Sequence, residues 1–311
     1  MSYRWQEITS NAQFAPRDGA GALTLNGTMY LLGGWNPRDK VNFPRVCNSE
    51  VWSSVDGLTW TEIQPQAPWE GRHCAGWVVH DDRLWVVGGD VNQRHYQNDV
   101  WNSVDGVDWT RVTDCVPWGD RALHFTYSFR GGIWVMGGQT LPGFADGAER
   151  FFNDVWFTED GINWTRVLEH APWPPRGMSS GQVIFNDRMW ILGGGTYDTP
   201  TTPQRLFYND VWSTADGIEW TCHARHAAWE PRQYHEVAVW DGKLWVMEGC
   251  RRDCGNRNDV WYSADGVQWT ELPDTPWAPR HAASLFVHDD ALWMVTGNNL
   301  ESDVWKLVRE R

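Results

Sequence analysis

The sequence repeats itself about every 50 residues, and this repeat limits the possible folds more than any other feature. Five copies of one segment share a Val-Trp pair, a turn of the form Ser/Thr-x-Asp-Gly and a second Trp. Their turn glycines are Gly57, Gly106, Gly161, Gly217 and Gly266, which lie 49, 55, 56 and 49 residues apart. Asp-Gly between β-prone segments predicts a hairpin, because glycine adopts positive φ at little cost.

Each unit has another half, which precedes the Val-Trp pair. This half opens with an Arg, continues with alternating apolar residues, reverses at a short polar turn and, in four of the six units, ends at a glycine pair. Each unit therefore predicts four antiparallel strands, as in one blade of a β-propeller. The arginines that open the units are Arg17, Arg72, Arg121, Arg176, Arg232 and Arg280, so we expect six blades.

The last unit lacks a fourth strand of its own. It ends shortly after Val304-Trp305, whereas the N-terminal segment Trp5–Ile8 matches Trp60–Ile63 of the first unit. We expect residues 1–9 to complete the sixth blade, because this pairing removes two open sheet edges. Residues 1–311 are therefore predicted to form a single all-β domain, a six-bladed propeller closed by its N-terminal strand.

The chain resembles the kelch-repeat propellers, of which the central domain of galactose oxidase is one, over nearly its whole length. The matching features are the opening Arg, the glycine pair that ends the second strand and the aromatic residue of the third strand. The glycine pairs are Gly33-Gly34, Gly88-Gly89, Gly137-Gly138 and Gly193-Gly194, and the last two units depart from them with Glu248-Gly249 and Thr296-Gly297. A propeller with no attached effector domain is also similar in layout to the sialic acid epimerases.

The charge balance argues against some classes of partner. The chain has 26 basic and 40 acidic residues, a net charge of −14, so the basic surface that nucleic acid requires is not expected. No run approaches the ~18 apolar residues of a membrane span, and no apolar leader follows the first Met. We therefore expect a monomer in the cytoplasm that binds neither nucleic acid nor membrane.

Most of the 25 Trp residues are predicted to be scaffold, because 22 of them recur at four positions of the unit. The exceptions are Trp35, Trp77 and Trp240. Trp35 opens a long loop and is our candidate for stacking on a ligand. The carboxylate before each Val-Trp pair recurs as well, and we expect it to accept backbone hydrogen bonds where the third strand starts.

The loops between the second and third strands are long and differ from unit to unit. They share one face of the propeller with the connections between units, whereas the turns of the opposite face are short. Variable loops on a rigid scaffold predict a binding site on that face, over the central channel. The six opening arginines lie at the same level, so we expect the channel mouth to be locally positive and some guanidiniums to bind a carboxylate or phosphate.

The residue that follows the opening Arg differs between units. It is Asp18, His73 and His281 in the first, second and sixth units, which are neighbours in a closed ring. Two imidazoles and one carboxylate match the ligands of a non-haem iron site. These residues are therefore candidate ligands of iron or copper, and both histidines are also candidate acid–base catalysts.

The fifth unit carries a different group of polar residues. Glu248 replaces a glycine, and Tyr234 and His235 lie on the inner strand of the same unit. A carboxylate beside Arg251 and Arg252 can act as a general base with an electrophilic clamp. We therefore expect Glu248, Tyr234 and His235 to be catalytic and both arginines to bind ligand. Cys250 and Cys254 are either a disulfide or two thiols.

These features predict that the loop face binds a small anionic or polyhydroxylated, carbohydrate-like molecule. Because no effector domain is expected, turnover by acid–base chemistry of the epimerase, isomerase or lyase kind is favoured over a pure binding role. One alternative is a module that binds a protein or an acidic peptide. The other is a metal-dependent enzyme.

Overall fold

The computed structural model describes residues 2–90, 96–140, 150–177, 182–197, 204–253 and 255–310. Strands β2 to β5, which lie in the first blade, span Gly21–Leu25, Thr28–Leu32, Val51–Ser54 and Thr61–Gln64. Strands β6 to β9, in the second blade, span Gly76–His80, Arg83–Asp90, Tyr96–Ser103 and Trp109–Thr113. The third blade holds β10, β11, β14 and β15 at Phe125–Phe129, Gly132–Met136, Val155–Thr158 and Thr165–Leu168. A two-stranded ladder, β12 (Gln139–Thr140) with β13 (Arg150–Phe151), lies between its second and third strands.

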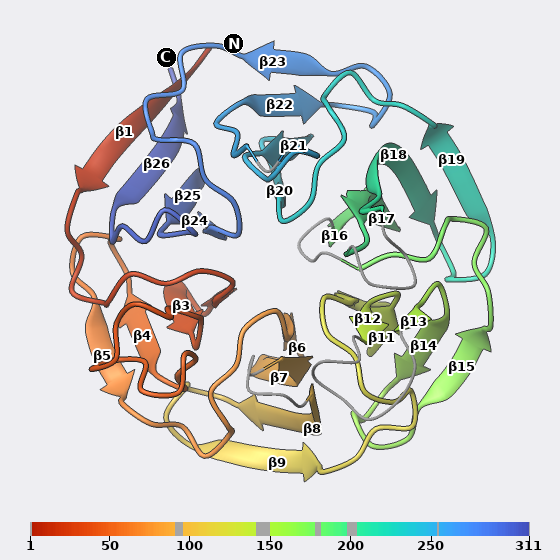
Figure 1. Ribbon diagram of the computed structural model, residues 1–311, viewed down its shortest axis with the longest axis horizontal. Helices are drawn as coiled ribbons and strands as arrows, with labels where there is room; N and C mark the ends of the chain where they lie inside the picture. Colours follow the sequence, from red (N-terminus) through yellow and green to blue (C-terminus); the bar gives the residue numbers. More distant parts are fainter. Residues whose placement is uncertain are drawn as a thin grey trace.

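Strands β16 to β19, in the fourth blade, span Gln182–Phe185, Arg188–Gly195, Phe207–Thr214 and Trp220–Ala224. Strands β20 to β23, in the fifth blade, span Glu236–Trp240, Lys243–Met247, Val260–Ser263 and Thr270–Leu272. The sixth blade holds β24 to β26, at Ser284–His288, Ala291–Val295 and Val304–Arg309, and it ends with β1, at Tyr3–Thr9. Every blade is antiparallel, and the six blades form a ring with their first strands innermost (Figure 1). The predicted six-bladed propeller is confirmed. No helix long and apolar enough to cross a membrane occurs in the described part of the chain.

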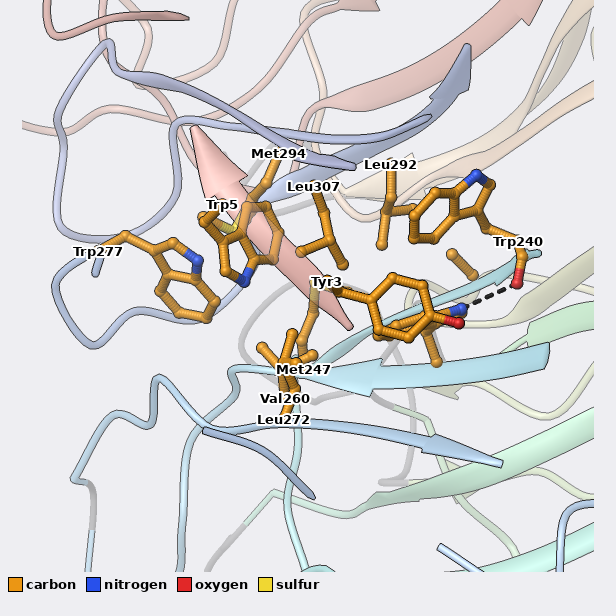
Figure 2. Packing of buried hydrophobic residues seen from close by; sticks show 13 residues of the cluster. Tyr3, Trp5, Trp240, Met247, Val260, Leu272, Trp277, Leu292, Met294 and Leu307 are labelled. Atoms are coloured by element: carbon orange, nitrogen blue, oxygen red, sulfur yellow. Dashed lines mark hydrogen bonds between the residues drawn. The ribbon is translucent and has the colours of Figure 1, made fainter. Parts of the chain in front are cut away.

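The N-terminal strand closes the ring, as the match between Trp5 and Trp60 predicted. Strand β1 pairs antiparallel with β26, and Trp5 lies opposite Leu307. Tyr3 and Trp5 are buried in a core cluster that also contains Trp277, whose ring centroid lies 5.7 Å from that of Trp5 (Figure 2). The outer strand of the sixth blade thus comes from the opposite end of the chain.

The Asp-Gly turns join each blade to the preceding one. In the first turn, Asp56 Oδ1 accepts hydrogen bonds from Leu58 N at 2.9 Å and Thr59 N at 2.8 Å. Gly57 has φ of +70°, and a Cβ at this position would collide with Trp293 of the sixth blade. A Cβ at Gly161, Gly217 or Gly266 would likewise collide with Trp85, Trp134 or Trp190 of the preceding blade, and a Cβ at Gly106 would crowd Ile63 and Tyr30. The recurring glycine and the aromatic residue of the second strand are therefore two sides of one blade-to-blade contact.

The opening arginines are bound to the carboxylates that precede the third strands. Arg176 is fully buried, and its guanidinium contacts both carboxylate oxygens of Asp210, at 2.5 and 2.8 Å. Trp212 Nε1 donates to the same carboxylate at 2.8 Å. The other five pairs are Arg17–Glu50, Arg72–Asp99, Arg121–Asp154, Arg232–Asp259 and Arg280–Asp303.

Two expectations are therefore corrected. The recurring carboxylates accept hydrogen bonds from a guanidinium and an indole, whereas we expected backbone donors. The six arginines have at most 1% of their surface exposed, so none of these guanidiniums is left free for a ligand. The glycine pair explains the contact: at Gly34, for example, a Cβ would lie 3.0 Å from Arg17 Cδ, so only a bare backbone lets the arginine pass to the third strand.

Candidate functional site

A cavity of about 380 Å³ opens where the chain enters the innermost strands. We call it the axial pocket. Its lining includes Asp18, Trp35, Arg38, His73, Cys74, Tyr197, Tyr234, His281 and Asn298. Five of the candidates from the sequence, namely Asp18, Trp35, His73, Tyr234 and His281, are thus brought together. They come from the first, second, fifth and sixth blades, whose inner strands surround the axis (Figure 1).

A chain of backbone hydrogen bonds holds this level of the propeller together. Cys74 N donates to Gly19 O at 3.2 Å, Gly19 N donates to Ala282 O at 3.0 Å, and Ala282 N donates to Tyr234 O at 2.8 Å. These four residues have φ between +51° and +57°. In these blades the left-handed turn after the opening Arg ties one blade to the next, and it fixes the backbone of residues that line the pocket.

The two histidines are held by hydrogen bonds on two sides of the pocket. His73 Nδ1 lies 2.9 Å from Asp90 O, and its ring is stacked near Trp35, with 6.2 Å between the centroids. A carbonyl oxygen only accepts, so Nδ1 of His73 is the donor of this hydrogen bond. Within the described residues its Nε2 has no hydrogen-bond partner.

His281 is fixed in the same tautomer by two asparagines. Its Nδ1 lies 2.7 Å from Asn256 Oδ1, and its backbone N donates to Asn298 Oδ1 at 2.8 Å. Asn256 Nδ2 also donates to Asn298 Oδ1, at 2.9 Å, which sets the orientation of both amides. Burial, with the nearby charge of Arg205, lowers the pKa of His281 to about 4. The imidazole is therefore neutral at pH 7, and its Nε2 accepts hydrogen bonds.

Asp18 lies between the two histidines in blade order, with 7% of its surface exposed. Burial raises the pKa of its carboxyl to about 7, and His73 partly offsets this effect. Tyr234 stacks on His281 with 5.1 Å between the ring centroids, so aromatic rings face the pocket beside both histidines. The site thus combines aromatic surface with three acceptor groups.

No metal centre is formed by the predicted ligands. The described ranges contain no group of three or more His, Cys, Asp or Glu side chains placed to hold a metal ion. Asp18, His73 and His281 line the same pocket but form no such group, so the expectation that they bind iron or copper is not supported by this arrangement.

Glu248 and His235 are not in the pocket either. Glu248 is fully buried, at φ of +53°, in the place of a glycine. Burial raises the pKa of the Glu248 carboxyl well above the ordinary value. Arg280 and the nearby amides of Ala283 and Gly249 oppose this effect only in part. Neither carboxylate oxygen has a hydrogen-bond partner within the described residues. His235 is fully buried and its Nε2 lies 2.7 Å from Leu192 O. Neither residue can touch a ligand in the axial pocket, so their predicted catalytic roles are corrected.

The two loop arginines lie at another place. Arg251 and Arg252 line a second cavity of about 450 Å³ with Arg205, Phe207 and Glu230. Arg251 is bound to Asp253 at 2.6 Å. The expectation that these arginines assist a carboxylate at the channel is therefore not met, because they line the rim between the fourth and fifth blades. The predicted alternatives for Cys250 and Cys254 lie outside the described residues, which do not include Cys254.

Four residues near the site were missed by sequence reasoning, namely Arg38, Tyr197, Asn256 and Asn298. Only Asn298 carried a usable signal. Asn298 directly follows the Thr296-Gly297 pair, as Trp35 and Asp90 follow the glycine pairs of their own units. Residues at this position pair with the residue after the opening Arg, as Trp35 does with Asp18 and Asp90 with His73. The other three lie in irregular loops with no counterpart in other units.

Fold and pocket together define a six-bladed β-propeller with a hollow at one end of its axis. No family model matches the chain, and no curated protein matches it. Among solved structures, the structure of YjhT is similar to this chain, with a TM-score of 0.72 over 96% of this chain and 95% of that chain. The sequences are 16% identical, so this likeness supports the fold alone.

Proposed function

We propose that the axial pocket binds a small polyhydroxylated molecule of the carbohydrate kind. The observation that carries the proposal is the fixed tautomer of His73 and His281. Each donates from Nδ1 to an oxygen of the protein, which leaves Nε2 for a ligand, and the neutral ring of His281 has a lone pair there. Ligand hydroxyls are the donors that such acceptors need.

The rest of the lining agrees with a sugar-like ligand. Trp35 and Tyr234 supply flat apolar faces of the kind that pack against the C–H surface of a sugar ring. The volume of about 380 Å³ falls within the range of small-molecule sites. Because the six scaffold arginines are bound to carboxylates, a requirement for a strongly anionic ligand is not supported. Arg38 lines the pocket and suits one carboxylate on an otherwise neutral molecule.

Ligand-observed NMR with a panel of aldoses, ketoses, polyols and sugar acids tests this proposal. We expect at least one probe to bind the intact chain, and Trp35→Ala to weaken that binding at least tenfold. Arg252→Gln, in the rim cavity, is the matched control and should leave the affinity unchanged. Binding that survives Trp35→Ala and is lost in Arg252→Gln would place the ligand at the rim instead. A panel with no binder would refute the carbohydrate proposal.

A further inference from the structure

Asp18 stands apart from the other buried carboxylates near the axis. The carboxylates before the third strands are each held by an arginine, as Asp210 is by Arg176. Within the described residues, by contrast, the Asp18 carboxylate accepts no hydrogen bond and joins no ion pair. The equivalent positions of the other blades hold His, Ala, Gly, Gln and His, so this carboxylate has no role in the repeat.

The backbone around Asp18 is rigid. Asp18 N donates to Trp35 O at 3.0 Å, and Trp35 N donates to Asp18 O at 2.9 Å. The next residue, Gly19, hydrogen bonds to the second and the sixth blades through its O and N. A buried, unpaired carboxylate costs stability, because burial opposes its charge. Such a group on a rigid support therefore indicates a functional role. Asp18 lines the axial pocket together with His73 and His281, so its carboxylate lies beside a molecule bound there.

We propose that Asp18 is the proton-transfer group of an enzyme that forms an enolate from a hydroxyaldehyde or hydroxyketone bound in the axial pocket. This inference rests on the proposed function. The Asp18 carboxylate takes the proton from the carbon next to the carbonyl and becomes a carboxylic acid. The electron pair of the broken C–H bond forms a C=C bond, and the carbonyl π pair moves to oxygen, which becomes the enolate. Return of the proton to carbon restores the carboxylate, so no oxidant or other reactant is required.

The surroundings of Asp18 fit this task. With its pKa raised to about 7, the carboxyl exists in both forms at neutral pH, as an efficient general base does. The titratable and charged groups of this cluster are His73, Cys74 and Asp90 on the second blade, Cys47 and Arg38 on the first-blade loop, Tyr197 and Arg205 on the fourth, Tyr234 on the fifth and His281 on the sixth. Among these lining groups Arg38 carries the positive charge that an enolate oxygen attracts.

Isotope exchange tests the step on many probe molecules in parallel. The intact chain is incubated in D2O with glyceraldehyde, dihydroxyacetone and a panel of pentoses, hexoses and keto sugar acids, and deuterium on carbon is measured by mass spectrometry and NMR. Proton transfer contributes roughly 10²–10⁴-fold to such rates. We therefore expect a probe that binds to gain deuterium, and Asp18→Asn to slow the gain at least 100-fold while leaving its affinity within a few fold. Asp187→Asn, an exposed carboxylate elsewhere, should exchange as the unmodified chain does.

The outcomes separate the two proposals. A probe that binds in the axial pocket but gains no deuterium overturns the role of Asp18 and leaves the binding function standing. An Asp18→Asn variant that exchanges at the original rate has the same meaning. A panel in which nothing binds overturns both. Asp18→Glu keeps the carboxylate, and a partial return of exchange in this variant supports proton transfer over a structural effect.

Discussion

Removing one scaffold carboxylate should destabilise the propeller by several kcal/mol. In Asp210→Ala, the fully buried guanidinium of Arg176 loses both of its contacts to the carboxylate, and the indole of Trp212 loses its acceptor. Breaking a buried ion pair by removing one partner costs about 3–5 kcal/mol. The lost hydrogen bond from the indole to the charged carboxylate adds about 1.5–3 kcal/mol. We therefore expect the free energy of unfolding to fall by about 4.5–8 kcal/mol in total.

Urea denaturation followed by tryptophan fluorescence measures this loss. Asp210→Asn keeps an acceptor for Trp212 and should lose less than Asp210→Ala. The control is Asp187→Ala, which breaks the exposed pair with Arg130 and should change stability by about 0–1 kcal/mol. A loss below about 1 kcal/mol in Asp210→Ala would refute the reasoning, because the buried arginine would then be tolerated without its anion.

Four further predictions concern the clasp, the fifth blade, the axial pocket and the scaffold carboxylates. Deletion of residues 1–9 should lower stability by several kcal/mol or cause aggregation, since it exposes an apolar face, and an unchanged melting curve would contradict the clasp. Glu248→Gln should raise the melting temperature at pH 8 and have little effect at pH 4. Because burial raises the pKa of Glu248 in the folded state, this residue lowers the free energy of unfolding once the pH exceeds its ordinary pKa in the unfolded chain, and Gln removes that loss. Deuterium exchange should rise with pH to a plateau, with a midpoint at about 7 set by Asp18, and a flat profile would argue against this base. Burial raises the pKa of Asp99, but the hydrogen bond and charge of Arg72 lower it further, so the folded-state pKa lies below the ordinary value. The stability that Asp99 contributes is therefore lost as the pH falls through its folded-state pKa, and Asp99→Asn should flatten the pH dependence of the melting temperature below pH 4.

The repeat made the fold predictable. Six opening arginines and five Asp-Gly turns set the number of blades, and the match of Trp5 to Trp60 identified the closing strand. The repeat also placed the six arginines at one level, but we expected them to bind a ligand because their partners in the scaffold could not be named. Their contact crosses the second strand at the glycine pair, and a sequence does not show that a missing side chain opens a path between the first and third strands.

The site was predictable only where the units can be aligned. Asp18, His73 and His281 occupy one aligned position, and the structure brings all three to the axial pocket. Glu248 was misassigned because a residue that breaks the repeat was taken as functional, although in the structure it faces the interior. Asn256 escaped notice because irregular loops have no internal counterpart for comparison.

The clasp between β1 and β26 also determines when the chain can finish folding. These two strands lie about 300 residues apart, so they cannot meet until nearly the whole chain has been synthesised. At about 5–20 residues per second, β1 waits roughly 15–60 s for its partner. During this time Tyr3 and Trp5 have no core to enter, and the edge of the strand is open to other chains. The same pairing that seals the finished ring therefore leaves the nascent chain with an open strand edge until its synthesis is nearly complete.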